Sequence, residues 1–409
     1  MIKLYIYQVG ALSEVDIELN RVNIITGPQS SGKSTIAKII SYCQWVEKRY
    51  LLDGKYEFDI EEQLLDFHRI SNSYFNSNSK INYNSDFVEI KITFIDNKIK
   101  EEIISKKNEQ SYKKTKNIYI PSERNFVSVI PNLGRYKETN DNIMSFLYDW
   151  YSAKKRYSKD SSLPILDLNV EFYHLEDSDS DILILKNQKK EINLRDSSSG
   201  LQSLTPLTLL IDYLTEKFYR ENNSKSNNEL DSVKDITNKL IEDFLTKHRQ
   251  NNKKIVRKDI EKEFLKILDT AKNRIAYSET KFIIEEPEQN LFPETQRDFI
   301  YYLFSKLNNS ERKHSVLLTT HSPYILYAIN NCLMGYNISQ KLNSEEKEEF
   351  KSHPAWINPD EVSLFEIKNG NISSIKDLRT NTVTKHYFNE NLNEIMNEYY
   401  EMLNYFSQI

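Results

Sequence analysis

Glycine is scarce in this chain, and its scarcity makes its placement informative. Only 8 of the 409 residues are glycine, yet Gly27 and Gly32 fall together in one short stretch. Glycine is the residue that allows backbone conformations closed to other residues, or a close approach of the backbone to a ligand. The stretch that contains this pair is therefore the first candidate for a functional loop.

Cysteine and long apolar runs are also lacking. Two cysteines, Cys43 and Cys332, are too few for a disulfide framework and suit a reducing cytosol. The longest apolar candidate, residues 201–214, is interrupted by polar residues and a proline, and it falls short of the roughly 18 residues that a membrane span needs. Residues 1–8 alternate as in a short strand and do not resemble a signal peptide. We therefore expect a cytoplasmic protein with no membrane partner.

No single sign of charge dominates. The net charge is -5, and a hydrophobic content of 39% is enough for a sizeable core and for two lobes. This balance neither indicates nor excludes nucleic acid, because local patches matter more than totals. The candidate basic patches are more typical of a solvated face. They are Lys113-Lys114, Lys154-Lys155-Arg156, Lys189-Lys190, and Lys253-Lys254 with Arg257-Lys258.

The glycine pair belongs to a P-loop pattern. Residues 27–34 read G-x-x-x-x-G-K-S, between an apolar run at 22–25 and a helical run that follows. Such a loop and the start of its helix present backbone N–H groups to phosphate, the lysine reaches the β- and γ-phosphates, and the serine hydroxyl can bind Mg²⁺. The pattern thus predicts ATP and Mg²⁺ as cofactors. The expected phosphate-binding residues are Gly27, Ser30, Ser31, Gly32, Lys33, Ser34 and Thr35.

Three weaker motifs follow along the chain. Residues 198–202 read Ser-Ser-Gly-Leu-Gln before a helical run, an apolar strand ends in Glu285 and Glu286, and another strand ends in His321. Each has an ordinary alternative, namely a helix cap, a surface turn and a structural histidine. Glu123 and Arg124, after a further buried-type strand, are secondary candidates with a structural ion pair as their alternative.

The order of these motifs resembles the ABC-type ATPase head, the superfamily that includes Rad50, SMC, RecF and the OLD-like ATPases. Residues 119–124 (YIPSER), 284–288 (IEEPE) and 319–323 (TTHSP) look like the bacterial AAA family ATPases of anti-phage defence, including PARIS and Septu ATPase subunits. The resemblance covers most of the chain. It implies an α/β fold with a β-rich N-terminal subdomain, a parallel core sheet and a helical lobe that contains an insertion.

The resemblance also implies roles in hydrolysis. Glu285 stands at the Walker B position and would support Mg²⁺ together with Ser34. Glu286 would polarise the attacking water, and His321 would be the switch histidine that contacts the γ-phosphate. Gln44 lies too early in the chain for the glutamine that senses the γ-phosphate in such heads, and we expect it on the surface or in the core.

A second group of residues is implied to act between subunits. Ser199, Gly200 and Gln202 resemble the ABC signature and would act in trans, on ATP held by a second subunit, with Leu201 in place of the usual second glycine. Residues 289–293 would form the D-loop at the dimer seam, with Phe292 where relatives often have histidine. ATP would therefore join two heads, and hydrolysis would open them.

The pattern of runs predicts how the chain is divided. We expect a first ATPase lobe at 1–134, a helical lobe at 135–278 with an insertion at 215–275, the rest of the ATPase core at 279–380 and a C-terminal helix at 381–409. Within them we expect a Ser/Asn-rich loop at 71–85, hairpins at 87–105 and 362–375, and β-type residues at 165–195. Tyr5 and Tyr7 are candidates to support adenine, with ordinary strand packing as the alternative.

These expectations combine into two functions. The first is an ATP-hydrolysing, nucleotide-gated dimerisation switch, a homodimer or higher homo-oligomer, that acts as the sensor ATPase of an anti-phage defence system and controls a separate effector such as a nuclease or toxin. The alternative is a DNA-repair or chromosome-maintenance ATPase of RecF or Rad50 type that clamps DNA directly. A transporter subunit is disfavoured by the long interval between residue 202 and Glu285.

Overall fold

A computed structural model describes residues 2–54, 57–106, 111–129, 141–222, 276–384 and 386–406. Its strands are β1 (Ile2–Val9), β2 (Leu12–Leu19), β3 (Val22–Thr26), β4 (Lys80–Asn84), β5 (Val88–Ile95), β6 (Lys98–Ser105), β7 (Thr115–Ile120), β8 (Leu163–Pro164), β9 (Val170–Leu175), β10 (Ser180–Leu185), β11 (Lys190–Asn193), β12 (Glu279–Glu285), β13 (Ser315–Thr320), β14 (Val362–Lys368) and β15 (Asn371–Ser374). Its α-helices are α1 (Lys33–Asp53), α2 (Phe126–Val129), α3 (Asn142–Lys154), α4 (Ser199–Asp212), α5 (Phe218–Asn222), α8 (Pro293–Asn309), α9 (Pro323–Ile338), α10 (Ser344–Glu348) and α11 (Tyr387–Phe406). In these ranges, no helix combines the length and apolar character that a bilayer crossing requires.

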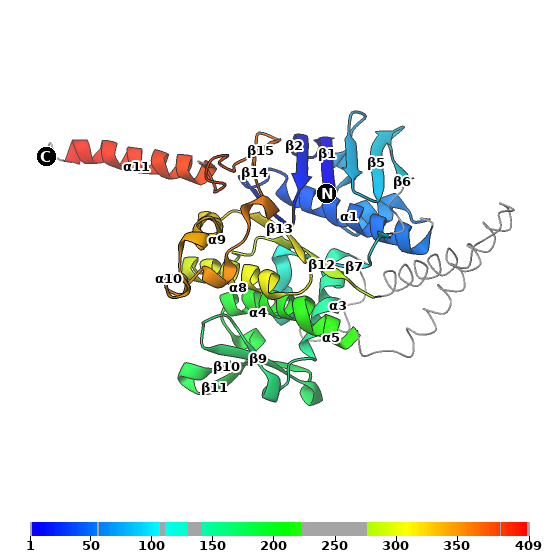
Figure 1. Ribbon diagram of the computed structural model, residues 1–409. Helices are drawn as coiled ribbons and strands as arrows, with labels where there is room; N and C mark the ends of the chain where they lie inside the picture. The colour runs from blue at the N-terminus through cyan, green and yellow to red at the C-terminus, as the bar shows by residue number, and fades with distance from the viewer. Residues whose placement is uncertain are drawn as a thin grey trace, which may run out of the picture.

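An 11-stranded sheet organises the molecule, in the order β6-β5-β4-β1-β2-β15-β14-β3-β13-β12-β7. The half from β14 to β7 is parallel, whereas the half from β6 to β2 is antiparallel (Figure 1). The expected α/β fold, with a β-rich N-terminal part and a parallel core, is confirmed.

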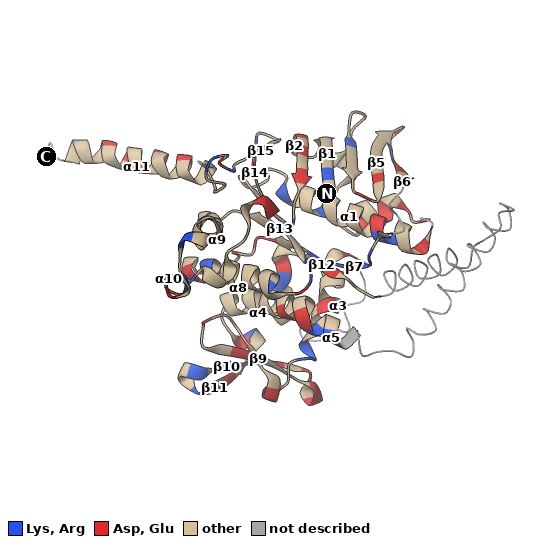
Figure 2. Cartoon of the chain, viewed as in Figure 1, with Lys and Arg blue, Asp and Glu red and all other residues tan. Residues whose placement is uncertain are grey.

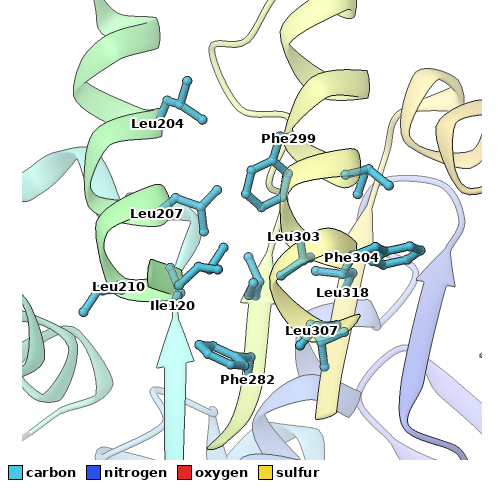
Figure 3. Close-up of a cluster of buried hydrophobic side chains, with 14 of the residues drawn as sticks. Ile120, Leu204, Leu207, Leu210, Phe282, Phe299, Leu303, Phe304, Leu307 and Leu318 are labelled. Atoms are coloured by element: carbon cyan, nitrogen blue, oxygen red, sulfur yellow. The ribbon is translucent and has the colours of Figure 1, made fainter. Parts of the chain in front are cut away.

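Helices cover both faces of the parallel half. Alternate residues of one strand enter two separate cores, as with Ile24 and Ile25 of β3. The core that contains Ile25 includes the apolar residues of α1, and the core that contains Ile24 includes those of α4, α8 and α9. Figure 3 shows the core that contains Ile24, in which Leu207 of α4 and Phe299 of α8 point toward one another. Burial on both faces explains why these strands are continuous apolar runs in the sequence.

Both expected hairpins form. The β5–β6 pair turns at Asp96 and Asn97, and the β14–β15 pair turns at Asn369 and Gly370, all with positive φ. Two successive residues with positive φ match the twist of antiparallel strands. The predicted loop at 71–85 is wrong over its second half, because Lys80–Asn84 forms β4 between β1 and β5.

The β-type residues at 165–195 form a separate antiparallel sheet of 4 strands, β8 to β11. Lys154, at the end of α3, is 3% exposed, and its Nζ lies 2.9 Å from Asp179 Oδ1. It also pairs with Asp181, whose carboxylate contacts the buried His174. The expected exposure of the basic patch at 154–156 is therefore wrong for Lys154, which ties α3 to this small sheet.

Two sequence predictions fall largely outside the described residues. The insertion is predicted at 215–275. Its residues 215–222 extend α4 through a π-helical turn into α5. Residues 223–275, which include the basic candidates at 253–258, lie outside the described residues. The predicted boundary at 134 also lies outside, within residues 130–140.

Candidate nucleotide-binding site

The candidate site lies where four parallel strands end. Strands β3, β13, β12 and β7 are consecutive neighbours, paired in register so that Thr320 faces Thr26 and Glu285 faces Thr319. The loops after these strands therefore meet at one edge of the sheet, the usual ligand edge of such sheets. This topology brings together the P-loop, residues 285–288 and His321, which are far apart in the sequence.

The P-loop needs both of its glycines. Gly27 and Gly32 have φ angles of 148° and 101°. A Cβ atom on Gly27 would lie 2.6 Å from the Ile367 carbonyl oxygen, and one on Gly32 would lie 2.5 Å from Leu12 Cδ2. A larger residue would strain the backbone at either position and displace its neighbours. The loop is thus packed closely enough against β14 and β2 to hold a fixed cradle.

Lys33 begins α1 directly after this loop. Its buried Nζ donates hydrogen bonds to the carbonyl oxygens of Gly27 at 2.9 Å and Pro28 at 2.7 Å. Burial lowers the pKa of Lys33 to about 8, although the nearby carboxylates of Glu286 and Glu288 partly oppose this effect. The ammonium group therefore lies inside the loop, where a bound phosphate would replace these carbonyl oxygens as the acceptor of its hydrogen bonds.

Glu285, at the end of β12, meets the P-loop at Ser34. Burial raises the pKa of this carboxyl, and the hydroxyls of Ser34 and Tyr119 act in the opposite direction. Its Oε1 atom and the Tyr119 hydroxyl are buried, and neither completes a hydrogen bond of ordinary geometry with the described residues. An orphaned carboxylate oxygen beside a serine hydroxyl fits a hard cation such as Mg²⁺, which takes oxygen ligands.

Glu286 and His321 are brought into contact. His321 Nε2 lies 3.2 Å from Glu286 Oε1, and both side chains are partly exposed. The hydrogen bond from His321 is the largest influence on the pKa of Glu286, which is lowered overall, and Lys33 and Arg124 act in the same direction. Glu286, the first residue after β12, also has a φ of 43°. This backbone conformation is strained for a residue other than glycine, and such strain is frequent at functional sites.

Glu288 fixes the loop that contains His321, a role that the sequence motifs do not indicate. Its carboxylate accepts a hydrogen bond from the backbone N–H of His321. Burial raises its pKa, and its Oε2 atom has no hydrogen-bond partner among the described residues. The only sequence signal for this role is the third acidic residue after the strand.

Arg124 is the second residue whose role sequence reasoning missed. It is fully buried and does not pair with Glu123, which forms the ion pair given as the structural alternative, but with Arg69. Its guanidinium donates to five backbone carbonyls. They belong to Pro121, Ser203, Glu285, Glu286 and Pro287. The Arg124 side chain thus joins three segments, which are the loop after β7, the loop after β12 that contains Glu286, and helix α4.

The signature-like residues lie at the start of α4. Ser199 is exposed, and the Gln202 amide donates to the carbonyls of Arg195 and Ser197. A Cβ atom on Gly200 would lie 3.0 Å from the Asn290 carbonyl oxygen. The predicted signature and the predicted D-loop are therefore in direct contact within one chain. Phe292 of that D-loop is 74% exposed, which is unusual for a large aromatic residue.

The remaining candidates lie elsewhere. Gln44 is buried in α1, within the core. Tyr5 and Tyr7 stack on each other along β1, with ring centroids 6.5 Å apart, which is the strand packing given as their alternative. Cys43 and Cys332 are both buried and unbonded.

A P-loop after a parallel strand, with acidic residues and a histidine after the two neighbouring strands, defines a P-loop nucleotide-binding domain. Residues 22–326 match the family model described as "AAA domain, putative AbiEii toxin, Type IV TA system". The chain belongs to this AAA family.

Among solved structures the chain is similar to the SMC head domain from Thermotoga maritima, with 10% identity, a TM-score of 0.36 and coverage of 91% of this chain and 97% of that one. It is also similar to the Smc head domain with an extended coiled coil, bound to the C-terminal domain of ScpA, derived from Pyrococcus furiosus, with 9% identity, a TM-score of 0.39 and coverage of 97% and 99%. The recombination mediator protein RecF matches with 10% identity, a TM-score of 0.30 and coverage of 91% and 97%. No curated protein sequence matches. These structural likenesses are distant, and no activity of this chain follows from them.

Proposed function

We propose that this protein binds ATP with Mg²⁺, hydrolyses it, and uses the cycle to close and open a dimer of its heads. The observation that carries the proposal is the contact between Glu286 and His321, 3.2 Å apart, in a loop whose carboxylates also act on Lys33. A carboxylate held ionised beside a phosphate cradle is suited to orient and activate a water molecule.

The residues divide the work of hydrolysis. The P-loop amides and Lys33 hold the phosphates, and Glu286 accepts the proton of the attacking water. His321 orients Glu286 and approaches the γ-phosphate side of the site. Ser34 and Glu285 would hold Mg²⁺, which would supply positive charge to the phosphate oxygens. Arg124 and Glu288 keep these loops in place through backbone groups.

The position of the signature-like residues supports the proposed dimer. Ser199 is exposed at the start of α4, and the neighbouring D-loop presents Phe292 to solvent. We infer that a second head covers this surface when ATP is bound and that Ser199, Gly200 and Gln202 contact the partner's ATP. Loss of the γ-phosphate removes these contacts, and the heads then separate.

The switch would act in defence against phage, as the sensor ATPase for a separately encoded effector. The description of the matched family names a toxin and a type IV toxin–antitoxin system, which favours an ATPase linked to a toxic activity. The effector would be a nuclease or toxin on another chain. Its release or retention would depend on whether the heads are closed.

A second candidate, direct DNA binding as in a RecF or Rad50 type ATPase, is favoured by one basic cluster. Burial, together with the charges of Lys116 and Lys114, lowers the pKa of Lys48 to about 7. Lys48 and Lys114 both lie over the ring of Tyr277, with Nζ atoms 4.9 Å and 4.3 Å from its centroid. The charges of Lys114 and Lys116 beside an aromatic ring suit a nucleic-acid backbone, and a bound phosphate would favour the protonated form of Lys48.

The rate of ATP hydrolysis tests the proposal and separates the two candidates. The wild type should hydrolyse ATP in the presence of Mg²⁺, and Lys33→Ala should not; equal rates would refute the assigned site. Linear double-stranded DNA is then added at about 0.1 M salt, where exposed charges still act over roughly 10 Å. Stimulation that disappears at high salt and in Lys114→Glu would favour the DNA-binding candidate. A rate indifferent to DNA would favour control by a protein partner.

A further inference from the structure

Helix α11 leaves the body of the protein and extends into solvent (Figure 1). Its first turn is fixed to the head, because Lys368 Nζ lies 3.0 Å from Glu390 Oε2 and the backbone N–H of Tyr387 donates to Glu366. Phe388 packs against the main core. From residue 390 to residue 406 every residue is exposed. A helix of this length, about 30 Å for 20 residues, is left without tertiary packing along most of its course.

The exposed part carries an apolar stripe with coiled-coil spacing. Leu392, Met396, Tyr399, Leu403 and Phe406 are separated by four, three, four and three residues in turn. This is the a/d pattern of a heptad repeat, which places all of these side chains on one seam. Tyr399 is 54% exposed and Phe406 is 74% exposed. The stripe is widened by further exposed apolar side chains at the flanking e and g positions, which are Ile395, Tyr400 and Met402.

The charges of α11 lie away from this seam. The helix contains no lysine or arginine, and the charged residues that Figure 2 shows along it are all acidic. In the same heptad register, Glu390 takes position b, Glu394 and Glu401 take position f, and Glu398 takes position c. These are the outer positions of a coiled coil. Two copies can therefore meet along the seam without opposing like charges, although the helix as a whole is acidic.

An isolated helix of this kind is marginal in water, since most helical stability in proteins comes from packing of an apolar face. The apolar seam therefore needs another helix to pack against. A basic partner helix would be recognised through acidic e and g positions, and this helix has none there. We propose that α11 is a self-association helix, whose seam pairs with the α11 of a second copy of this chain independently of nucleotide. The resulting contact is separate from the ATP-dependent closure of the heads.

Disulfide trapping tests this pairing directly. Tyr399 lies at the centre of the seam, so it lies near its counterpart whether two copies pair in parallel or antiparallel. The native cysteines are buried, which leaves an introduced cysteine as the reactive thiol. Nucleotide-free Tyr399→Cys should form a linked dimer under mild oxidation, whereas Asn397→Cys, on the outer face of the same turn, should form little. Equal linking in the two variants, or none in either, would overturn the proposal.

The mass in solution provides the second measurement. In nucleotide-free protein, Tyr399→Lys should weaken self-association at least about tenfold, because a charge enters the apolar seam. Asn397→Lys adds the same charge on the outer face and should leave the mass unchanged. Because ATP is absent, these results do not depend on the proposed hydrolysis cycle. A wild type that is monomeric at all concentrations, or an equal loss in both variants, would contradict the pairing.

Discussion

His321 Nε2 lies 3.2 Å from Glu286 Oε1, and this contact joins the loops that follow β13 and β12. Its hydrogen bond is the main reason that the pKa of Glu286 lies below its ordinary value. Glu286 is therefore ionised at neutral pH, as a residue must be if it is to accept a proton from water. Because each residue directly follows one of two adjacent strands, the geometry of the sheet maintains this pair.

Replacing Glu286 tests its role as general base. Glu286→Gln keeps the size of the side chain but removes the proton acceptor, so hydrolysis should fall by about 100-fold or more. ATP binding should be retained, because the phosphate-binding residues are unchanged. Steady-state ATPase assays and nucleotide binding should be compared with Glu345→Gln, an exposed residue of α10. A rate within a factor of about two of wild type would remove Glu286 from this role.

The pH profile tests the contact with His321. In wild type, Glu286 is active when ionised, so activity should persist above its lowered pKa and be lost as the pH falls through it. His321→Asn removes the main influence that lowers this pKa, and Lys33 and Arg124 remain. The acid limb of the ATPase profile should therefore move to higher pH. An acid limb at the same pH in both proteins would show that the contact does not control the ionisation of Glu286.

Arg124 should be needed for both stability and turnover. Arg124→Lys keeps a positive charge but cannot reach five carbonyls at once, so buried acceptors would be left unpaired. We expect a loss of about 3 kcal/mol in the free energy of unfolding. Denaturant unfolding measures this loss, and Arg69→Lys, a half-exposed residue paired with Glu123, serves as the control. Similar small losses in both variants would refute the central position of Arg124.

Mixing two inactive variants tests whether the signature acts in trans. Ser199→Arg should block the partner's site but leave its own P-loop intact, and Lys33→Ala should do the reverse. Each alone should hydrolyse ATP poorly, and a mixture should recover activity through dimers that contain one functional site. Ser161→Arg, at an exposed position remote from α4 in the sequence, should remain active alone. A mixture no more active than its components would contradict action between subunits.

The fold was largely predictable because its signals are local. The runs that became β3, β12 and β13 are buried on both faces, and the P-loop glycines stand out in a chain that has few. Residues 80–84 escape prediction as a strand because Ser and Asn obscure the alternation of Ile81 and Tyr83, which become buried only through pairing with distant strands.

The parts of the site that escaped prediction depend on contacts over long sequence distances. Arg124 donates to carbonyls more than a hundred residues away, and no sequence pattern records a backbone acceptor. Lys154 belongs to a basic run that predicts exposure, but its ion pairs with Asp179 and Asp181 require the small sheet. Glu288 was visible as a third acidic residue, yet its partner is a backbone group of the next loop.

The most direct test of the ATP-gated switch is the solution mass of Glu286→Gln in the variant background Tyr399→Lys, which removes the proposed α11 contact. Light scattering should be recorded with Mg²⁺ and either ATP or ADP. The account predicts a dimer with ATP and a monomer with ADP, because the γ-phosphate completes the contact between heads while hydrolysis is blocked. The same mass in both nucleotides would contradict a nucleotide-gated dimer.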